Sequence, residues 1–145
     1  MTPEIAVCER LAATAEVTAI VSTRIWEITL PENPVVPAIR VQIISEPLTY
    51  HLRGPNGLRR SRVQVDAYVS ERAVSSVDDP GANANALADA IDTCLSGATF
   101  SAGGSPAEIE VTGVFRQDRR VLREPDELRY LRVMQDYIVW SKPAS

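Results

Sequence analysis

Apolar residues recur at helical spacing in two parts of the chain. Near the N-terminus, Thr2 suits a helix N-cap and Pro3 suits the first helical position. The apolar residues that follow predict a helix over about residues 3–13 and a further turn or two to about Ser22. A second helical stripe consists of Ala84, Leu87, Ala88, Ile91 and Leu95. Gly97 is expected to end this second helix, because glycine readily adopts the left-handed backbone of a helix C-terminus.

A period of two marks two strands in the centre of the chain. In "AIRVQIIS", residues 38–45, the apolar residues of one face are Ile39, Val41 and Ile43. In "LRRSRVQVDAYVS", residues 58–70, one face carries Val63, Val65, Ala67 and Val69, and the other carries Arg62, Gln64, Asp66 and Tyr68. Consecutive strands are usually neighbours, so we expect an antiparallel hairpin. Its second strand is expected to be half exposed, with the valines facing the helices.

Three further strands complete the expected sheet. One begins at Ile25 and ends at the prolines of "PENPVVP", because proline has no N–H to donate to a strand ladder. Another carries Ile109, Val111, Gly113 and Phe115, which are expected to share one face. The last, "RYLRVMQDYIVW", residues 129–140, is apolar on both faces, which predicts a strand that is interior to the sheet or covered on two sides.

These elements predict an α+β fold in a single domain over residues 1–145. The expected order is helix, three strands, helix, two strands. We expect a mostly antiparallel sheet with two helices packed on one face. The hairpin strands are separated by "TYHLRGPNGLRR", which is longer than the two residues that a tight hairpin needs. This segment predicts a long β-hairpin arm with its tip at the Pro-Asn-Gly turn, Gly54–Gly57.

Composition narrows the class of protein. The chain is 45% hydrophobic and 23% charged, as globular domains are, and its net charge of -4 argues against a general nucleic-acid binder. It has no apolar run near the roughly 20 residues of a membrane span, and its first residues do not resemble a signal peptide. We therefore expect a protein made in a reducing cytoplasm. Cys8 and Cys94 lie in helix-like apolar patterns, which indicates buried free thiols.

Candidates for catalytic chemistry are few. His51 is the single histidine, and no serine or aspartate near it has the spacing of a catalytic triad, so we interpret it as a solvated loop residue. The "GPNG" loop lacks the spacing of a phosphate-binding loop. Glu108 and Glu110 could bind a cation together, but a solvated strand edge is the simpler interpretation. We predict no enzyme activity, no catalytic residue, no cofactor and no metal.

Arginines gather in and beside the predicted arm. Arginine is enriched at protein interfaces because it stacks and forms bidentate hydrogen bonds. The predicted partner-contact residues are Arg53, Asn56, Arg59, Arg60 and Arg62. A second basic run, expected at another strand turn, is Arg116, Arg119, Arg120 and Arg123. As a nucleic-acid patch the first cluster has no nearby aromatic ladder beyond Tyr50, and the chain is acidic, so an interaction protein is favoured.

The serial order of these segments resembles a known family. The resemblance rests on four segments: "AVCERLAATAEVTAIVSTRIWEITLPENPVVPAIRVQII", "RSRVQVDAYVSERA", "ANALADAIDTCLSG" and "YLRVMQDYIVW". Together they resemble the tail-completion or tail-terminator proteins of long-tailed bacteriophages, which also occur in prophages and gene transfer agents. The resemblance runs from about residue 4 to residue 141. The family has no catalytic motif, so it assigns no catalytic residue to this chain.

The resemblance implies a structural virion protein. Such proteins form a ring, expected to be a hexamer, that caps the head-proximal end of the tail tube, ends its polymerisation and offers a docking face to the head. The implied partners are further copies of the chain, the tail-tube protein and the head connector or stopper protein, with no membrane involved. The ring is assembled in the bacterial cytoplasm and resides in the virion tail or a tail-like particle. DNA passes through it without specific binding, which suits an acidic chain.

Two alternatives stay open. One is a head-closure or connector protein of the same particle, which only partner mapping separates from a terminator. The other is a small stand-alone α+β enzyme or ligand-binding domain around His51, which requires a closed pocket lined by converging polar groups. A ring former should elute far above the monomer mass of 15.9 kDa.

Overall fold

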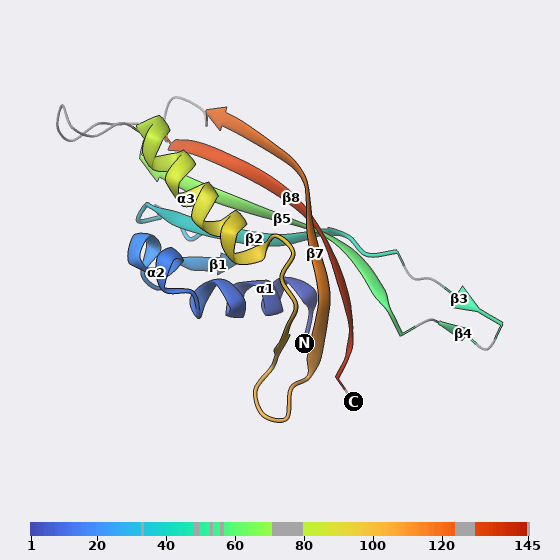
Figure 1. Ribbon diagram of the computed structural model, residues 1–145. Coiled ribbons are helices and arrows are strands. Elements are labelled where there is room, and N and C mark those ends of the chain that lie inside the picture. The colour runs from blue at the N-terminus through green and yellow to red at the C-terminus, as the bar shows by residue number, and fades with distance from the viewer. Residues whose placement is uncertain are drawn as a thin grey trace.

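The computed structural model describes residues 1–32, 34–47, 50–52, 54–55, 57–70, 80–123 and 130–144. Within these residues the chain forms helices and strands that alternate along the sequence (Figure 1). The helices are α1 (Pro3–Ala12), α2 (Ala15–Val21) and α3 (Pro80–Leu95). The strands are β1 (Ile25–Glu27), β2 (Ala38–Ser45), β3 (Tyr50–His51), β4 (Gly54–Pro55), β5 (Arg59–Ser70), β6 (Phe100–Ala102), β7 (Ile109–Arg123) and β8 (Tyr130–Pro143).

The main sheet is mostly antiparallel, as predicted. It has six strands in the order β1-β2-β5-β8-β7-β6. β8 lies between β5 and β7, which confirms the prediction that the doubly apolar strand is interior. β1 is the exception, because it runs parallel to β2. The proline-rich segment after β1 carries the chain back to the start of β2, so the two strands point the same way.

The helices lie together on one face of the curled sheet (Figure 1). The sequence predicted two helices there, and the described chain has three. The reason is Thr14, whose backbone is extended (φ -100, ψ 115) and separates α1 from α2. No helix among the described residues is long and apolar enough to cross a membrane.

The hydrophobic core fills the space between the helices and the sheet. Val63, Val65, Ala67 and Val69 of β5 are all buried there, which confirms the predicted face. The predicted stripe of α3 is also buried, from Ala84 to Leu95. The helix ends at Leu95, and Gly97 follows with φ 73, the left-handed conformation expected of a stop signal.

The opposite face of β5 differs from the prediction. Gln64 and Arg62 are partly or fully exposed, but Asp66 and Tyr68 are buried. No helix among the described residues covers this face of the sheet. Arginine side chains from neighbouring strands cover these two residues instead, so the expectation of a half-exposed strand is wrong at both.

The predicted face of β7 is also wrong beyond Val111. Its pairing with β8 shifts between Val111 and Gly113, where Thr112 is an extra residue. Such a bulge exchanges the two faces of the strand that follows. Val114 therefore joins the core, and Phe115, expected to share a face with Ile109, is 51% exposed.

The arm is present, but its tip is not where the sequence placed it. β3 and β4 form a two-stranded sheet of their own, in which Tyr50 pairs with Pro55 and His51 with Gly54. The chain therefore reverses between His51 and Gly54, the shortest common hairpin connection. Gly54 and Pro55 belong to a strand, so the predicted tip at Gly54–Gly57 is wrong. In Figure 1 the arm extends well beyond the body of the domain.

Candidate functional site

The arm, residues 46–58, and the start of β5 carry the predicted contact residues. Arg59 and Arg60 begin β5 at the base of the arm, where Arg60 is exposed and Arg59 is 41% exposed along its side chain. Glu46 ties this base together, because its Oε1 accepts a hydrogen bond from the Ser61 hydroxyl at 3.2 Å and lies 3.9 Å from Arg59 Nη1. Arg53, Asn56 and the imidazole of His51 lie outside the described part of the structure.

Arg62 differs from Arg59 and Arg60 because it is engaged within the sheet. Its Nη2 donates to Asp136 Oδ2 of β8 at 2.7 Å. The Asp136 side chain is buried, and this hydrogen bond raises the pKa of the Arg62 guanidinium above its ordinary value. About half of the Arg62 side chain still faces solvent. Arg62 can therefore contact a partner without releasing Asp136.

Arg62 belongs to a row of arginines on the sheet face opposite the helices. We call this surface the arginine face and define it by Arg40, Arg62, Arg120 and Arg132. Arg40 donates to Asp66 Oδ2 from Nη2 at 2.6 Å and from Nε at 3.1 Å. Arg120 Nε lies 3.0 Å from Asp118 Oδ2. Aspartates on adjacent positions therefore compensate much of the positive charge of this face.

Tyr68 lies between two of these arginines. The guanidinium carbons of Arg40 and Arg132 lie 5.8 Å and 5.9 Å from its ring centroid, within cation–π range. Arg132 Nη1 also donates to the Tyr68 hydroxyl oxygen at 3.3 Å. Burial under these side chains raises the pKa of the phenol. The arrangement places the guanidinium groups of Arg40 and Arg132 against the Tyr68 ring at the centre of the arginine face.

Sequence reasoning missed Arg40 and Arg132. They are isolated in the sequence, and only the strand register places Arg40 opposite Asp66 and Arg132 opposite Tyr68. The available signal was the alternation of "AIRVQIIS" and "LRVMQDY", which puts each arginine on the side away from the core. Local clustering could not identify them.

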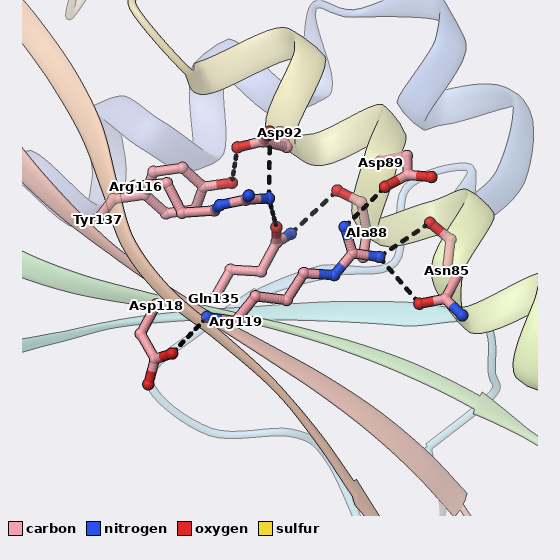
Figure 2. A network of polar contacts seen from close by, with 9 residues as sticks. All are labelled: Asn85, Ala88, Asp89, Asp92, Arg116, Asp118, Arg119, Gln135 and Tyr137. Atoms are coloured by element: carbon pink, nitrogen blue, oxygen red, sulfur yellow. Dashed lines mark hydrogen bonds and ion pairs between the residues drawn. The ribbon is translucent and has the colours of Figure 1, made fainter.

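The second basic run has another role. Its described residues lie along β7 and not at a turn, which corrects the prediction. Figure 2 shows Arg116 and Arg119 reaching from β7 to α3. Arg119 donates from Nη1 to Asp89 at 2.7 Å and from Nη2 to the Asn85 side chain at 2.9 Å. These arginines fasten the helix to the sheet, so they are not available as a partner patch.

Two buried polar side chains of β8 complete this network (Figure 2). Gln135 Nε2 donates to the Ala88 carbonyl at 3.0 Å, and the Tyr137 hydroxyl donates to Asp92 Oδ1 at 3.0 Å. Burial, more than the nearby Asp92 charge, raises the pKa of Tyr137. Each group has the partner that a buried polar group requires, so the network orients α3 over the sheet.

In the part of the chain that the structure describes, groups that could perform chemistry do not converge. Glu108 Oε2 lies 3.1 Å from the terminal ammonium of Met1, whereas Glu110 pairs with Lys142 at 3.6 Å. Among the described residues, no group of three or more His, Cys, Asp or Glu is placed to hold a metal ion. Both cysteines are free thiols, as predicted; Cys94 is buried, and Cys8 is only half-buried.

A hollow of about 520 Å³ opens between the N-terminal helices and the start of β1. We call it the α1–α2 groove. It is lined by Ile5, Cys8, Glu9, Ala12, Thr18, Ser22, Thr23 and Ile25. The groove is shallow and mostly apolar, unlike an active site with converging polar groups. The sequence did not predict it, because its lining residues come from three separate elements.

Comparison with known proteins assigns this chain to a family. The family model described as "Tail completion protein gp17" matches residues 5–142. The chain belongs to this tail completion family. A solved structure titled "Virion of native gene transfer agent (GTA) particle" contains a chain with the same fold, at a TM-score of 0.63 and 18% identity, covering 99% of this chain and 95% of that one. No curated protein matches.

Membership confirms the resemblance drawn from the sequence. As a tail completion protein, the chain is a structural component of a virion tail. The family consists of structural proteins. This agrees with the finding that the described carboxylates and thiols do not converge on one site.

Proposed function

We propose that this tail completion protein forms a ring, a hexamer, that caps the head-proximal end of the tail tube. The ring ends tube polymerisation and presents its other face to the head connector or stopper protein. It has no enzyme activity, and DNA passes through it without specific binding. A closed ring of identical chains needs two different complementary surfaces on each copy, joined head to tail.

The arm is the observation that carries this proposal. It extends beyond the body and cannot be explained by the packing of its own domain (Figure 1). Arg59 and Arg60 give its base a positive charge on a chain whose net charge is -4. A neighbouring copy or the tail tube therefore offers a complementary surface. We propose Arg53, Asn56, Arg59, Arg60 and Arg62 as its contact residues.

The ion pairing of the arginines on the arginine face supports passage of DNA without binding. Arg40, Arg62 and Arg120 are each held by an aspartate. Binding to the phosphate backbone depends on cations that can replace its counterions, and these are already paired. Together with the acidic net charge, this pairing favours a surface along which DNA slides.

The test is removal of the gene from cells that produce the particle. We expect tails of uncontrolled length without heads, and restoration of uniform, head-bearing tails by the wild-type chain. Electron microscopy of purified particles measures both properties. Headless tails of normal length would reject the cap and assign the chain to head closure, the remaining alternative in the same particle.

A further inference from the structure

The tip of the arm presents an apolar side chain. Leu52 follows β3, at the point where the arm reverses, and it is fully exposed. Nothing among the described residues covers it. Scattered exposed leucines are common, but this one is at the end of a projecting hairpin, where a partner can reach it. Its burial in another molecule would remove apolar surface from water.

The α1–α2 groove is an apolar surface that could receive such a side chain. Ile5, Cys8 and Ala12 of α1 line one side, and Ile25 at the start of β1 lines another. The groove is open to solvent and no described segment of the same chain fills it. It is therefore accessible from outside without movement of the helices.

The charges around the groove are complementary to those of the arm. Glu9 lines the groove, and none of its lining residues is basic. Glu27 and Glu4 lie close enough to act on Cys8: burial raises the pKa of this thiol to about 12, with further contributions from Glu27 and then Glu4. The charged residues that line the groove or act on Cys8 are thus acidic, whereas the arm carries Arg59 and Arg60 at its base.

The arm and the groove of one chain point in different directions. In Figure 1 the arm leaves one end of the body, and α2 and β1 lie at the other. One chain therefore cannot close its own arm onto its own groove. The same two surfaces on two copies can meet, and this head-to-tail arrangement repeats from copy to copy.

We propose that the arm of one copy inserts Leu52 into the α1–α2 groove of a second copy. The proposal rests on the ring proposed above and specifies which surfaces join its subunits. The occupant of the groove is a second copy of this chain, because the arm supplies both an exposed apolar tip and the opposite charge.

Covalent capture in assembled particles tests this contact. The variant Leu52→Cys with Ala12→Cys is made in a Cys8→Ser background, so that one pair of engineered thiols reports the contact. Purified particles are oxidised and separated by non-reducing electrophoresis. We expect a ladder of covalent multimers of the chain that disappears on reduction. The matched control combines Leu52→Cys with Ser101→Cys, an exposed position on β6 outside the lining of the groove, and should give no ladder.

The possible outcomes separate this contact from the function on which it rests. Particles with uniform tails but no ladder would reject the arm–groove contact and leave the capping function standing. If the ladder forms but removal of the gene leaves tail length and head attachment unchanged, the contact would be supported and the cap rejected. A ladder of equal strength in the Ser101→Cys control would also reject the contact, because it would show random collision.

A second pair of variants does not depend on cysteines. Ala12→Trp fills the groove from an exposed position of α1, and Ala13→Trp places the same side chain on the next exposed residue, outside the lining of the groove. We expect loss of uniform tails for Ala12→Trp alone, with unchanged circular dichroism in both. Uniform, head-bearing tails with Ala12→Trp would overturn the proposal.

Discussion

Arg40 and Asp66 lie opposite each other on β2 and β5, with Arg40 Nη2 2.6 Å from Asp66 Oδ2. The Asp66 side chain has no exposed surface, and Arg40 is 20% exposed. Gln64 Nε2 donates to both Asp66 oxygens at 3.0 Å. A buried carboxylate is tolerated only with such partners, so this pair fixes the register of the two strands.

Replacing Arg40 by methionine should therefore destabilise the domain. Among the described residues, Asp66 would keep Gln64 as its side-chain partner. Removal of one member of a buried ion pair typically costs about 3–5 kcal/mol. Urea unfolding measures the loss. Lys142→Met is the control, because its pair with Glu110 is half exposed and should contribute no more than about 1 kcal/mol. Equal losses in the two variants would show that the buried pair does not determine stability.

Val65→Asp should destabilise the domain more severely. Val65 is completely buried against the helices, and an unpaired carboxylate there should lower the free energy of unfolding by at least about 3 kcal/mol. Val35→Asp introduces the same side chain at a position that is 67% exposed and should change stability by about 0.5 kcal/mol or less. Thermal unfolding compares them. A wild-type melting temperature for Val65→Asp would mean that the faces of β5 are exchanged.

The double substitution Arg59→Glu with Arg60→Glu should leave the monomer folded but disturb tail assembly. It reverses the charge at the base of the arm, so contact with an acidic neighbour becomes repulsive. Electron microscopy should show tails of irregular length. Arg59→Lys with Arg60→Lys keeps the charge and should retain most of the length control. Uniform tails with heads attached in the glutamate variant would remove the assembly role of these arginines.

His51→Ala should leave tail assembly unchanged. The expectation comes from the absence of a triad or metal-ligand spacing around the single histidine. Particle yield and tail length are the measurements, with the wild-type chain in parallel. Discovery of a turnover activity that this substitution abolishes would favour the stand-alone enzyme instead.

Cys8 should react slowly with iodoacetamide despite its partial exposure. Its pKa is raised from 9.0 to about 12, so near pH 8 its thiolate is about a thousandfold scarcer than that of an unperturbed thiol. The rate should rise about tenfold per pH unit up to the folded pKa. The protonated thiol favours the folded state fully below about pH 9, and this contribution is lost as pH rises toward 12. Labelling of a Cys94→Ala variant by mass spectrometry follows this single thiol; rapid labelling at pH 8 would contradict the expectation.

Elements governed by a regular period could be predicted from the sequence. The core face of β5 and the stripe of α3 depend only on repeated spacing, and both were correct. Phe115 was misplaced because one extra residue at Thr112 exchanges the two faces of β7 as far as the second register shift, between Arg116 and Asp118. An apolar residue on either face leaves the same alternation, so the sequence pattern does not show the exchange. The split between α1 and α2 depends on the backbone of Thr14, which the continuous apolar pattern conceals.

The candidate site was harder to predict for a related reason. Arg59 and Arg60 were found because they are adjacent in the sequence. Arg40 and Arg132 meet Tyr68 only through strand pairing, and the α1–α2 groove is formed by residues of separate elements. The tip of the arm was misplaced because Pro-Asn-Gly is a strong turn signal, whereas the observed pairing of His51 with Gly54 puts the reversal between these two residues, ahead of that turn.

The position of β8 has a consequence for synthesis of the protein. It follows every other strand in the chain, yet it pairs with β5 on one side and β7 on the other. While the ribosome has not yet released residues 130–143, the two longest strands before it have no neighbour between them, and the sheet remains in two halves. A nascent or prematurely terminated chain therefore lacks part of the surface that holds α3, including Gln135 and Tyr137, and cannot present a finished subunit. Only full translation yields a competent building block, which protects the growing particle from incorporating fragments.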